Sequence, residues 1–516
     1  MDLVIDIEPG SGETTAAVYR ALRAAIVDGR VPSGHRLPAT RVLAADLGVS
    51  RGSVAGAYER LVAEGYLTAR VGAGTFVAGT PAGRRAPRPA PDPLRPRSGW
   101  TLTPQRTSGQ EPAPRYDFRA GIPDARLFPF DTWRRLVGAE LRLRANNPGT
   151  YADPAGHPAL RSAVARYLGY ARSLATTADE VVVTNGTQHA LDLIARVVLR
   201  PGDVAAVEEP GYPPARRLFG SLGARVVGVP VDEQGLVVSA LPDRCRLVYL
   251  TPSHQFPLGG VMSLARRREL LDWAGQRQVA IVEDDYDSEF RFCARPLEPL
   301  RALDRHGRVL YVGTFSKSML PAMRTGFVLV PPGLRPAILA ARQLSDAYGQ
   351  VAVQAALARF IDEGQLARHV RRAGRAYEDR RTRIVGMLER MPGLTVVPSS
   401  AGLHVTALLP PGADTTRIVT AARRAGLALE DLSAYAGEGP ADPPGLVFGF
   451  GAVDPELIEE GLAVLGRLLP AQASQASGSA EAEPEPEAGA EAEAGAEAEA
   501  GAEAGAGTGA RRSRQL

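Results

Sequence analysis

Between residues 116 and 470, short apolar runs alternate with longer segments of helical periodicity. The runs are rich in Val, Leu and Ile and lie at 181–183, 204–207, 247–250, 279–282 and 309–312. Continuous apolar runs of this length, separated by helical segments, are typical of strands that are buried on both faces of a parallel sheet. The pattern predicts an α/β domain over residues 116–470, with a mostly parallel sheet and helices on both faces.

A different pattern occupies residues 13–79. Apolar residues recur at four-residue spacing over residues 13–29, which predicts a helix. A second short helix is expected to run through Leu47, and a third to begin with Ser50 as its N-cap. Two short strands around a glycine-rich tip follow at residues 66–77. Helix, helix, turn, helix and hairpin is the order of a winged helix-turn-helix.

The third helix of this block is the candidate recognition helix. Arg51 and Ser53 lie at its N-terminal end, where side chains contact base edges and phosphates, and Arg41 would contact the DNA backbone. The glycine tip can approach a minor groove, since it has no side chains there. The other reading is a small helical docking domain, because the net charge of this block is only +3. The candidate DNA contacts are Arg41, Ser50, Arg51, Ser53, Gly72 and Gly74.

Two further segments differ in composition. Residues 80–115 hold nine prolines and seven arginines, which predicts an extended linker that sets the reach between two DNA half-sites. Residues 471–516 are rich in Glu, Ala and Gly, and nine glutamates against three arginines give them a net charge of −6. We expect this tail to be disordered. It either serves solubility or competes with DNA for the basic winged helix.

Charge and cysteine content narrow the setting. The whole chain carries +3, so residues 1–470 carry about +9, which is compatible with a polyanionic partner. Cys245 and Cys293 fit no metal or redox spacing, so no metal site is predicted. No apolar run approaches the ~18 residues that span a bilayer, and no signal peptide is present. We therefore expect a cytoplasmic protein without a membrane partner.

Lys317 is the only lysine among 60 basic residues. Arginine replaces lysine on most surfaces, but its guanidinium cannot form an imine with an aldehyde. Lys317 lies in the small polar turn GTFSKS (313–318) after an apolar run, and Arg324 follows seven residues later. This context predicts a Schiff base with pyridoxal 5′-phosphate (PLP).

Each part of PLP has a further candidate partner. Asp284 follows an apolar run and would keep the pyridine nitrogen protonated, while Tyr286 would contact the phenolic oxygen. The helix that begins near Thr187 offers free backbone N–H groups to the phosphate. The remaining candidates are Gln188, Ser316 and Arg324 for the phosphate and Tyr212 for stacking on the ring.

Two resemblances agree with these assignments. LPATRVLA (37–44), GVSRGSV (48–54), YERLVAEGYL (58–67) and GAGTFV (72–77) resemble the DNA-binding domain of the GntR family. Residues 116–470 resemble a fold-type I aminotransferase domain with a small C-terminal α+β part, through YDFRAGIP (116–123), YADPAG (151–156), TPSHQFPLG (251–259), EDDYDSEF (283–290) and GTFSKSMLPAMRTG (313–326). The combination is similar to the MocR subfamily of regulators.

The MocR resemblance implies PLP bound as an internal aldimine, a head-to-tail homodimer, and ligand binding that alters DNA recognition. It also implies that Tyr151 reaches the cofactor phosphate of the partner subunit. In some relatives an arginine stands where this chain has Ala55, so the operator sequence does not carry over.

The sequence departs from aminotransferases at two places. Asn-Pro-x-Gly is replaced by FPLG (256–259), so His254 or Gln255 substitutes for the asparagine or has a structural role in the turn. The arginine that binds a substrate carboxylate is replaced by Val447, and no arginine lies between residues 426 and 464. Losing this arginine removes binding energy and orientation for an amino acid.

The chain is therefore predicted to be a PLP-dependent transcription regulator that binds double-stranded operator DNA. PLP itself, another vitamin B6 compound or an amine adduct would be the effector. The alternative is an active aminotransferase with an accessory DNA-binding domain, which the intact Lys317, Asp284 and Tyr286 support and the lost arginine opposes.

Overall fold

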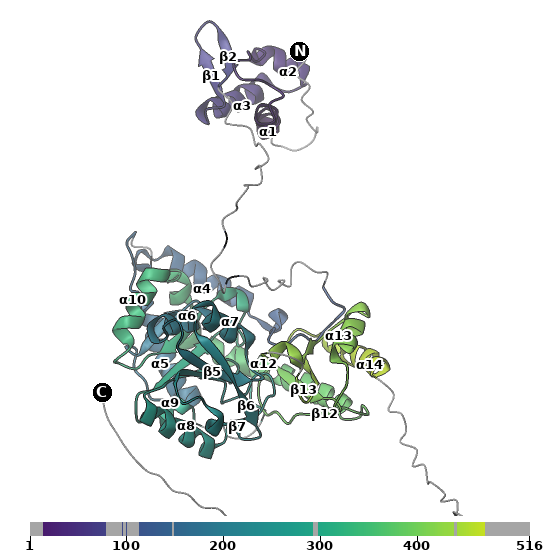
Figure 1. Ribbon diagram of the computed structural model, residues 1–516. Helices are drawn as coiled ribbons and strands as arrows, with labels where there is room; N and C mark the ends of the chain where they lie inside the picture. Colours follow the sequence, from purple (N-terminus) through teal and green to yellow (C-terminus); the bar gives the residue numbers. More distant parts are fainter. Residues whose placement is uncertain are drawn as a thin grey trace, which may run out of the picture. The chain divides into compact units, whose positions relative to one another are not determined.

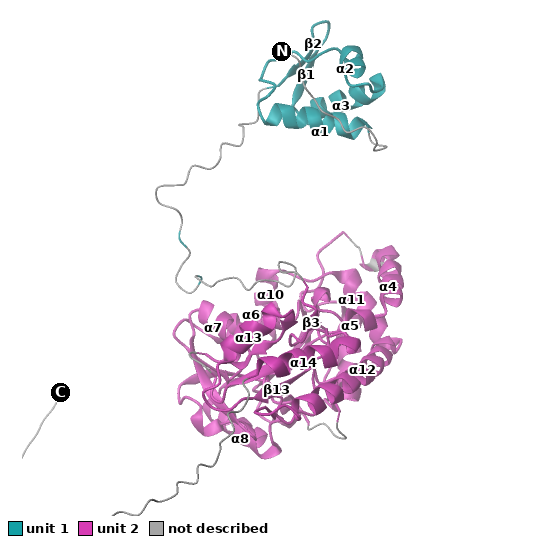
Figure 2. Ribbon diagram, turned by 90° about the vertical axis from the view of Figure 1, so that its right-hand side faces the viewer, with its two compact units in different colours: residues 1–102 teal, residues 103–516 magenta. Residues whose placement is uncertain are grey.

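A computed structural model describes residues 14–78, 95, 100, 113–146, 149–292, 298–437 and 441–469. The chain divides into two compact units, residues 1–102 and 103–516, which Figure 2 colours separately. None of the described helices is long and apolar enough to cross a membrane. Most of the predicted linker, all of the acidic tail and Cys293 lie outside the described residues.

The first unit has the predicted order of elements. It contains α1 (Thr14–Val27), α2 (Thr40–Asp46), α3 (Arg51–Ala63), β1 (Leu67–Arg70) and β2 (Gly74–Val77). Ser50 caps α3 as predicted, because its Oγ accepts the backbone N–H of Ser53 at 3.1 Å. Leu22, Val54 and Leu61 are fully buried in the core between the helices.

The second unit is built on an eight-stranded sheet with the order β4-β11-β10-β9-β8-β5-β6-β7. Its strands are β4 (Val181–Thr184), β5 (Val204–Glu209), β6 (Arg225–Asp232), β7 (Gly235–Leu236), β8 (Cys245–Leu250), β9 (Ala280–Asp285), β10 (Val309–Thr314) and β11 (Gly326–Leu329). The five predicted runs are β4, β5, β8, β9 and β10, and all five point the same way. Only β7 and β11 run against them, so the prediction of a mostly parallel sheet is confirmed for the described residues.

Helices cover both faces of this sheet, as predicted (Figure 1). Val182 packs on one face against α6 (Thr187–Val198), α7 (Pro213–Ser221) and α10 (Arg335–Ser345). Val181 and Val183 point to the opposite face, toward α5 (Pro158–Arg172) and α11 (Val351–Asp362). That face is also covered by α8 (Leu264–Arg277) and α9 (Leu300–Leu303). The alternation of single residues within each apolar run thus divides the core between two helical layers.

A smaller sheet of order β12-β13-β16-β15 forms the C-terminal part. Its elements and the helices around it are α12 (Gln365–Leu388), β12 (Thr395–Val396), β13 (His404–Leu408), α13 (Thr415–Arg424), β15 (Glu430–Asp431), β16 (Gly445–Gly449) and α14 (Ile458–Leu468). α4 (Phe130–Arg142) packs instead with α5 and α11 in a core of the large sheet. Val405 and Phe448 lie in its helix-covered core. His404 and Thr406 point the other way, and both bond the carbonyl of Pro257. This sheet is thereby fixed against the loop that follows β8.

The segment after residue 113 enters this part of the structure. β3 (Tyr116–Asp117) pairs in parallel with β14 (Leu427–Ala428). The pairing places Ala120 and Gly121 beside the carboxyl ends of the large sheet's strands, where both line a cavity.

Candidate functional site

The parallel strands end at one edge of the large sheet, and a cavity of about 270 Å³ lies at that edge. Polar residues that follow β4, β5, β8, β9 and β10 meet there, as expected at the carboxyl ends of strands in α/β folds. All predicted cofactor contacts except Tyr151 line this cavity: Thr187, Gln188, Tyr212, Asp284, Tyr286, Ser316, Lys317 and Arg324.

Lys317 projects into the cavity from the turn after β10. Its Nζ donates a hydrogen bond to the carbonyl oxygen of Gly121 at 2.6 Å. Gly121 has φ +74°, and a Cβ added there would lie 2.8 Å from Nζ, so glycine gives the amine its room. Burial lowers the pKa of the Lys317 ammonium, against the opposing pull of Asp287, Asp284 and Glu430. A lowered pKa favours the neutral amine, the form that attacks an aldehyde.

Asp284, at the end of β9, forms a hydrogen bond through only one of its two carboxylate oxygens. Its Oδ2 accepts the hydroxyl of Tyr249 at 2.7 Å, and its buried Oδ1 has no hydrogen-bond partner among the described residues. Burial raises the pKa of Asp284 to about 7. A buried, unpaired carboxylate oxygen fits the protonated ring nitrogen of PLP. Tyr249 could not be recognised as a site residue from the sequence, because it lies within an apolar run.

The phosphate candidates gather at the start of α6. The guanidinium of Arg324 lies against Gly186, where an added Cβ would be 3.4 Å from Nη1. The side-chain amide nitrogen Nε2 of Gln188 is buried without a partner, and the Ser316 hydroxyl accepts that of Thr314 at 3.0 Å. A helix N-terminus, an unpaired donor and a guanidinium together suit a phosphate dianion. This end of the cavity and the unpaired Asp284 oxygen both fit PLP.

Aromatic rings form the wall between these two ends. Tyr212 stacks on Tyr249, with ring centroids 6.3 Å apart and planes at 28°. The edge of Phe256 contacts both Tyr212 and Tyr286, at centroid distances of 6.0 and 5.7 Å. Burial raises the pKa of the Tyr286 phenol well above its usual 10, so Tyr286 presents a neutral hydroxyl.

The structure distinguishes the two candidates for the missing asparagine. Gln255 donates to the carbonyls of Pro210 and Phe256 at 2.9 and 2.8 Å, so it stabilises the turn. His254 lies behind Tyr286: its Nδ1 is 2.9 Å from the Tyr286 hydroxyl and 3.0 Å from Asp287. Neither Gln255 nor His254 lines the cavity.

His404 is a cavity residue that the sequence reasoning missed. It lies on β13, about 90 residues after the Lys317 turn, and its Nε2 is 3.0 Å from the Pro257 carbonyl oxygen. Burial holds the pKa of His404 well below 6.5. No motif around residue 404 indicates that its strand folds against the cavity.

Val447 occupies the position of the expected carboxylate-binding arginine. It is fully buried on β16 in an apolar cluster with Leu432 and Tyr435. Among the described residues that line the cavity, Arg324 is the only arginine. The cavity can therefore hold a phosphate but offers no second guanidinium to a substrate carboxylate.

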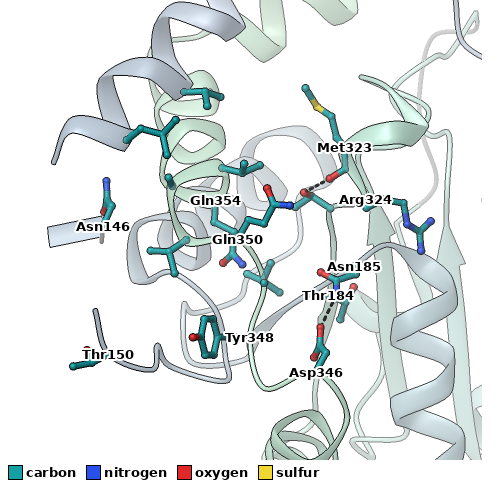
Figure 3. Close-up of a pocket in the computed structure, with 18 of the residues that line it drawn as sticks. Asn146, Thr150, Thr184, Asn185, Met323, Arg324, Asp346, Tyr348, Gln350 and Gln354 are labelled. Carbon is teal, nitrogen blue, oxygen red and sulfur yellow. Dashed lines mark hydrogen bonds between the residues drawn. The ribbon is translucent and has the colours of Figure 1, made fainter. Parts of the chain in front are cut away.

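Tyr151 lies outside this cavity and is 89% exposed. Its ring is 6.2 Å from that of Tyr348, which lines a second cavity of about 990 Å³ (Figure 3). Arg324 lines both cavities and is itself exposed. Asn185 and Asp346 both line this second cavity, and the side-chain amide of Asn185 donates to Asp346 at 2.5 Å (Figure 3). The phosphate end is thus open to solvent in a single chain.

None of the candidate DNA contacts in the winged helix is buried. Arg41, Ser50 and Arg51 are exposed and Ser53 is half-buried. The Ser50 hydroxyl also lies 2.9 Å from that of Ser53, so these two serines are tied to the start of α3. Gly72 and Gly74 lie at the tip of the β1–β2 hairpin with φ of +75° and +112°. This arrangement leaves Arg51 as the charged group that α3 presents at its N-terminus.

Comparison with known families gives the same division. Residues 14–77 match the family of bacterial regulatory proteins called gntR, and residues 127–431 match aminotransferase class I and II. The fold and the site thus define a transcription regulator in which a GntR-type DNA-binding domain is joined to an aminotransferase-like domain. Domains of the aminotransferase class I and II family typically bind PLP.

The chain belongs to the MocR-type regulators of the GntR family. It is 37% identical over 455 residues to the "Probable rhizopine catabolism regulatory protein MocR" of Rhizobium meliloti, covering 86% of this chain and 91% of that protein. It is 34% identical to the "HTH-type pyridoxine biosynthesis transcriptional regulator PdxR" of Corynebacterium glutamicum, covering 85% and 92%. Among solved structures, Pyrococcus horikoshii kynurenine aminotransferase matches with a TM-score of 0.65 and 28% identity, covering 70% of this chain and 94% of that chain.

Proposed function

We propose that this regulator responds to PLP, which it holds as an aldimine to Lys317. The observation that carries this proposal is a pair of unsatisfied buried atoms in one cavity, Asp284 Oδ1 and Gln188 Nε2. They are an acceptor and a donor, as the ring nitrogen and the phosphate of PLP require. The chain's single lysine lies in the same cavity.

The roles of the cavity residues follow from their contacts. Asp284 keeps the ring nitrogen protonated, which makes bound PLP an electron sink. Tyr286 donates to the phenolic oxygen, with its hydroxyl oriented by His254 at 2.9 Å. Tyr212 stacks on the ring. Thr187, Gln188, Ser316 and Arg324 bind the phosphate.

The working form in this proposal is a head-to-tail homodimer. The exposed Arg324 and the adjoining cavity leave the phosphate end open in one chain. Tyr151 and Leu344 are also exposed, at 89% and 88%, and Leu141 on the cavity wall is 57% exposed. In this proposal Tyr151 and the open phosphate end belong to the contact surface between subunits. A partner subunit would cover it, with Tyr151 reaching the partner's cofactor phosphate.

DNA recognition is assigned to the winged helices of the dimer. Two copies would read two half-sites of a double-stranded operator, with Arg51 and Ser53 at the bases and Arg41 at the backbone. Ser50, Gly72 and Gly74 complete the contact set. A relative named as a pyridoxine biosynthesis regulator supports PLP or another vitamin B6 compound as effector, and one named for rhizopine catabolism supports a small-molecule adduct. We place this activity in the cytoplasm.

One observation favours a second function, that of a working aminotransferase. The chain is 31% identical to the "Aromatic-amino-acid aminotransferase 1" of Thermococcus litoralis over 60% of its own length and 77% of that protein. Lys317, Asp284 and Tyr286 would serve the same chemistry. Val447 opposes this function, because an apolar side chain cannot orient a substrate carboxylate.

The proposal is tested by measuring, with fluorescence anisotropy, how the protein binds the intergenic DNA upstream of its own gene. The full chain is titrated at fixed salt, since phosphate contacts make affinity salt-dependent. PLP is expected to change the affinity or stoichiometry of the wild-type protein but not of Lys317→Arg, which keeps the charge and loses the imine. Specific DNA binding whose affinity and stoichiometry are unchanged by PLP and by amines would reject the proposal. Steady turnover of amino acids with 2-oxo acids at rates of about 1–10³ per second would establish the aminotransferase instead.

A further inference from the structure

Helix α12 carries a row of arginines on its outer face. Its inner face packs into the domain through Leu366, Ala373 and Tyr377, which are buried. The arginine row consists of four exposed residues, Arg368, Arg371, Arg372 and Arg375. Their spacings of three and four residues make them neighbours on the helix surface. Together with Pro129, the residue before α4, they line a hollow of about 600 Å³.

No carboxylate of the described residues neutralises the arginine row. Arg368 donates to the side-chain oxygen of Gln365 at 2.8 Å, and Arg372 donates to the backbone carbonyl of Leu127. Both acceptors are uncharged. His369 also lines the hollow, but burial lowers its pKa, so the positive charge there comes from the guanidiniums.

This arrangement is unfavourable for the helix by itself. Like charges three and four residues apart repel each other, and Arg368 lies in the first turn of α12, near the positive end of the helix dipole. Further along α12 the chain does supply partners, since Arg383 forms ion pairs with Asp379 and Glu459. The arginine row therefore retains a repulsion that a bound polyanion would relieve.

The arginine row lies close to the turn that carries Lys317. His369, which is buried in the same helical turns, interacts with the backbone of Ser318 and Leu127. Ser318 directly follows Lys317, and Leu127 is the residue whose carbonyl accepts Arg372. An anion bound to the row would thus be one side chain away from the Lys317 turn.

A DNA duplex has the charge density that this row requires. From Arg368 to Arg375 the helix rises about 10 Å, and a duplex carries one negative charge per about 1.7 Å of its axis. Each guanidinium can bind a phosphate through two parallel N–H groups. In the chain's own acidic tail, glutamates occur at most at every second residue, about 7 Å apart in an extended chain.

The segment between the two units is long enough for both to bind one duplex. Residues 79–112 separate the winged helix from the aminotransferase-like domain, and a chain of that length can span up to about 110 Å. We propose that the arginine row is a second DNA-contact surface, which binds backbone phosphates outside the bases that the winged helix reads. Such contacts add affinity without sequence preference. The inference rests on the DNA binding in the proposed function and does not require PLP.

Replacing the four arginines with glutamine tests this surface. The full-length wild type and the variant Arg368→Gln/Arg371→Gln/Arg372→Gln/Arg375→Gln are titrated onto fluorescent duplex from the upstream intergenic DNA at several salt concentrations. Each lost phosphate contact lowers the slope of log affinity against log salt by about 0.9. At low salt the variant should bind about tenfold more weakly or worse, with a slope smaller by about 2 or more.

A control variant makes the same change in net charge elsewhere. It replaces four other exposed arginines, which lie on α7, α8 and α13 and in the loop after α9, through Arg217→Gln, Arg268→Gln, Arg424→Gln and Arg305→Gln. This control should keep the wild-type slope. Replacing the arginine row with four lysines, which keeps the charge, should also keep the slope. Without DNA, the glutamine variant of the row should melt at the wild-type temperature or higher, because repulsion on α12 is removed.

Three outcomes would contradict the inference. The first is an equal slope for the wild type and the glutamine variant of the row, and the second is an equal loss of slope in the control. In the third, the slopes are equal and deleting residues 471–516 lowers the melting temperature of the wild type but not of the row variant. The acidic tail would then be the occupant of the row.

The same titration separates the inference from the proposed function. If the wild type binds no DNA at any salt concentration, the proposed function fails and the inference fails with it. If the wild type binds DNA and responds to PLP while the row variant keeps the wild-type slope, only the inference is wrong.

Discussion

We expect Asp284→Asn to weaken PLP binding while it raises the free energy of unfolding of the cofactor-free protein. Burial raises the pKa of Asp284 to about 7 from its ordinary 3.8. Each pKa unit corresponds to about 1.4 kcal/mol, so holding the buried carboxylate costs the cofactor-free protein about 4 kcal/mol at pH 8. Asparagine has nearly the same shape, still accepts from Tyr249 and carries no charge. The substitution should therefore stabilise the cofactor-free protein.

The sign of the pH dependence follows from the protons bound in each state. Between the two pKa values of Asp284, the folded protein keeps a proton that the unfolded chain has released. Stability therefore falls as pH rises through this interval, and the loss levels off above the folded-state pKa. At pH 5.5 the cost is about 2 kcal/mol, half of its value at pH 8. The advantage of the asparagine variant should shrink by that difference, about 2 kcal/mol.

Urea unfolding at the two pH values measures this difference, with the fluorescence of Trp133 and Trp273 as the signal. Asp272→Asn, on the exposed side of α8, is the control and should behave like wild type at both pH values. PLP should bind at least tenfold more weakly to Asp284→Asn, because the unpaired Oδ1 no longer offers a charge to the ring nitrogen. If the stability difference between Asp284→Asn and wild type were the same at pH 8 and pH 5.5, Asp284 would not have the raised pKa in the folded protein.

Three further predictions test other parts of the chain. Lys317→Ala should abolish the visible absorbance of bound PLP, and an unchanged band would contradict the imine assignment. Ser50→Ala removes the bond to the Ser53 N–H and should cost about 1 kcal/mol in unfolding of the first unit, with weaker DNA binding by anisotropy. Ser239→Ala, at an exposed position of the second unit, is its control and should leave both readouts unchanged. Gly186 has φ +83° and ψ 177°, a region open to glycine almost alone, so Gly186→Ala should cost about 1–3 kcal/mol and weaken PLP binding in calorimetric titration. Wild-type PLP affinity in that variant would argue against a phosphate site at α6.

The parts of the site that lie at strand ends could be predicted from the sequence. The apolar runs of β9 and β10 identify buried parallel strands, and such strands end at a common edge. Asp284 and Lys317 follow these runs, so their meeting in one cavity is a consequence of the strand pattern. The same local reasoning located Ser50, because an N-cap depends on residues within one helical turn.

Contacts between distant segments could not be predicted in this way. The Lys317 amine bonds the Gly121 carbonyl across 196 residues of sequence, and Glu430 faces Val447 only because of the register of β15 on β16. Hydrophobic periodicity predicts neither the contact between Lys317 and Gly121 nor the register of β15 on β16. Gln255 shows the reverse case, in which a polar residue inside a motif serves its own turn and does not reach the cavity.

The cost of Asp284 connects the cofactor site to regulation. A regulator needs its effector to shift the balance between two states by about 1–3 kcal/mol. Burying an unpaired Asp284 carboxylate costs about 4 kcal/mol near pH 8, and the protonated ring nitrogen of PLP, if it were bound by Asp284, would offset part of that cost. This cost lowers the stability of the cofactor-free folded chain, and under the proposed function PLP binding would restore part of that stability. An aminotransferase also has to orient its substrate. At the position expected for the carboxylate-binding arginine this chain has Val447, an apolar residue that cannot bind a carboxylate. Under the proposed function, the site therefore keeps the groups that would bind PLP and lacks an arginine that would bind the carboxylate of an amino acid.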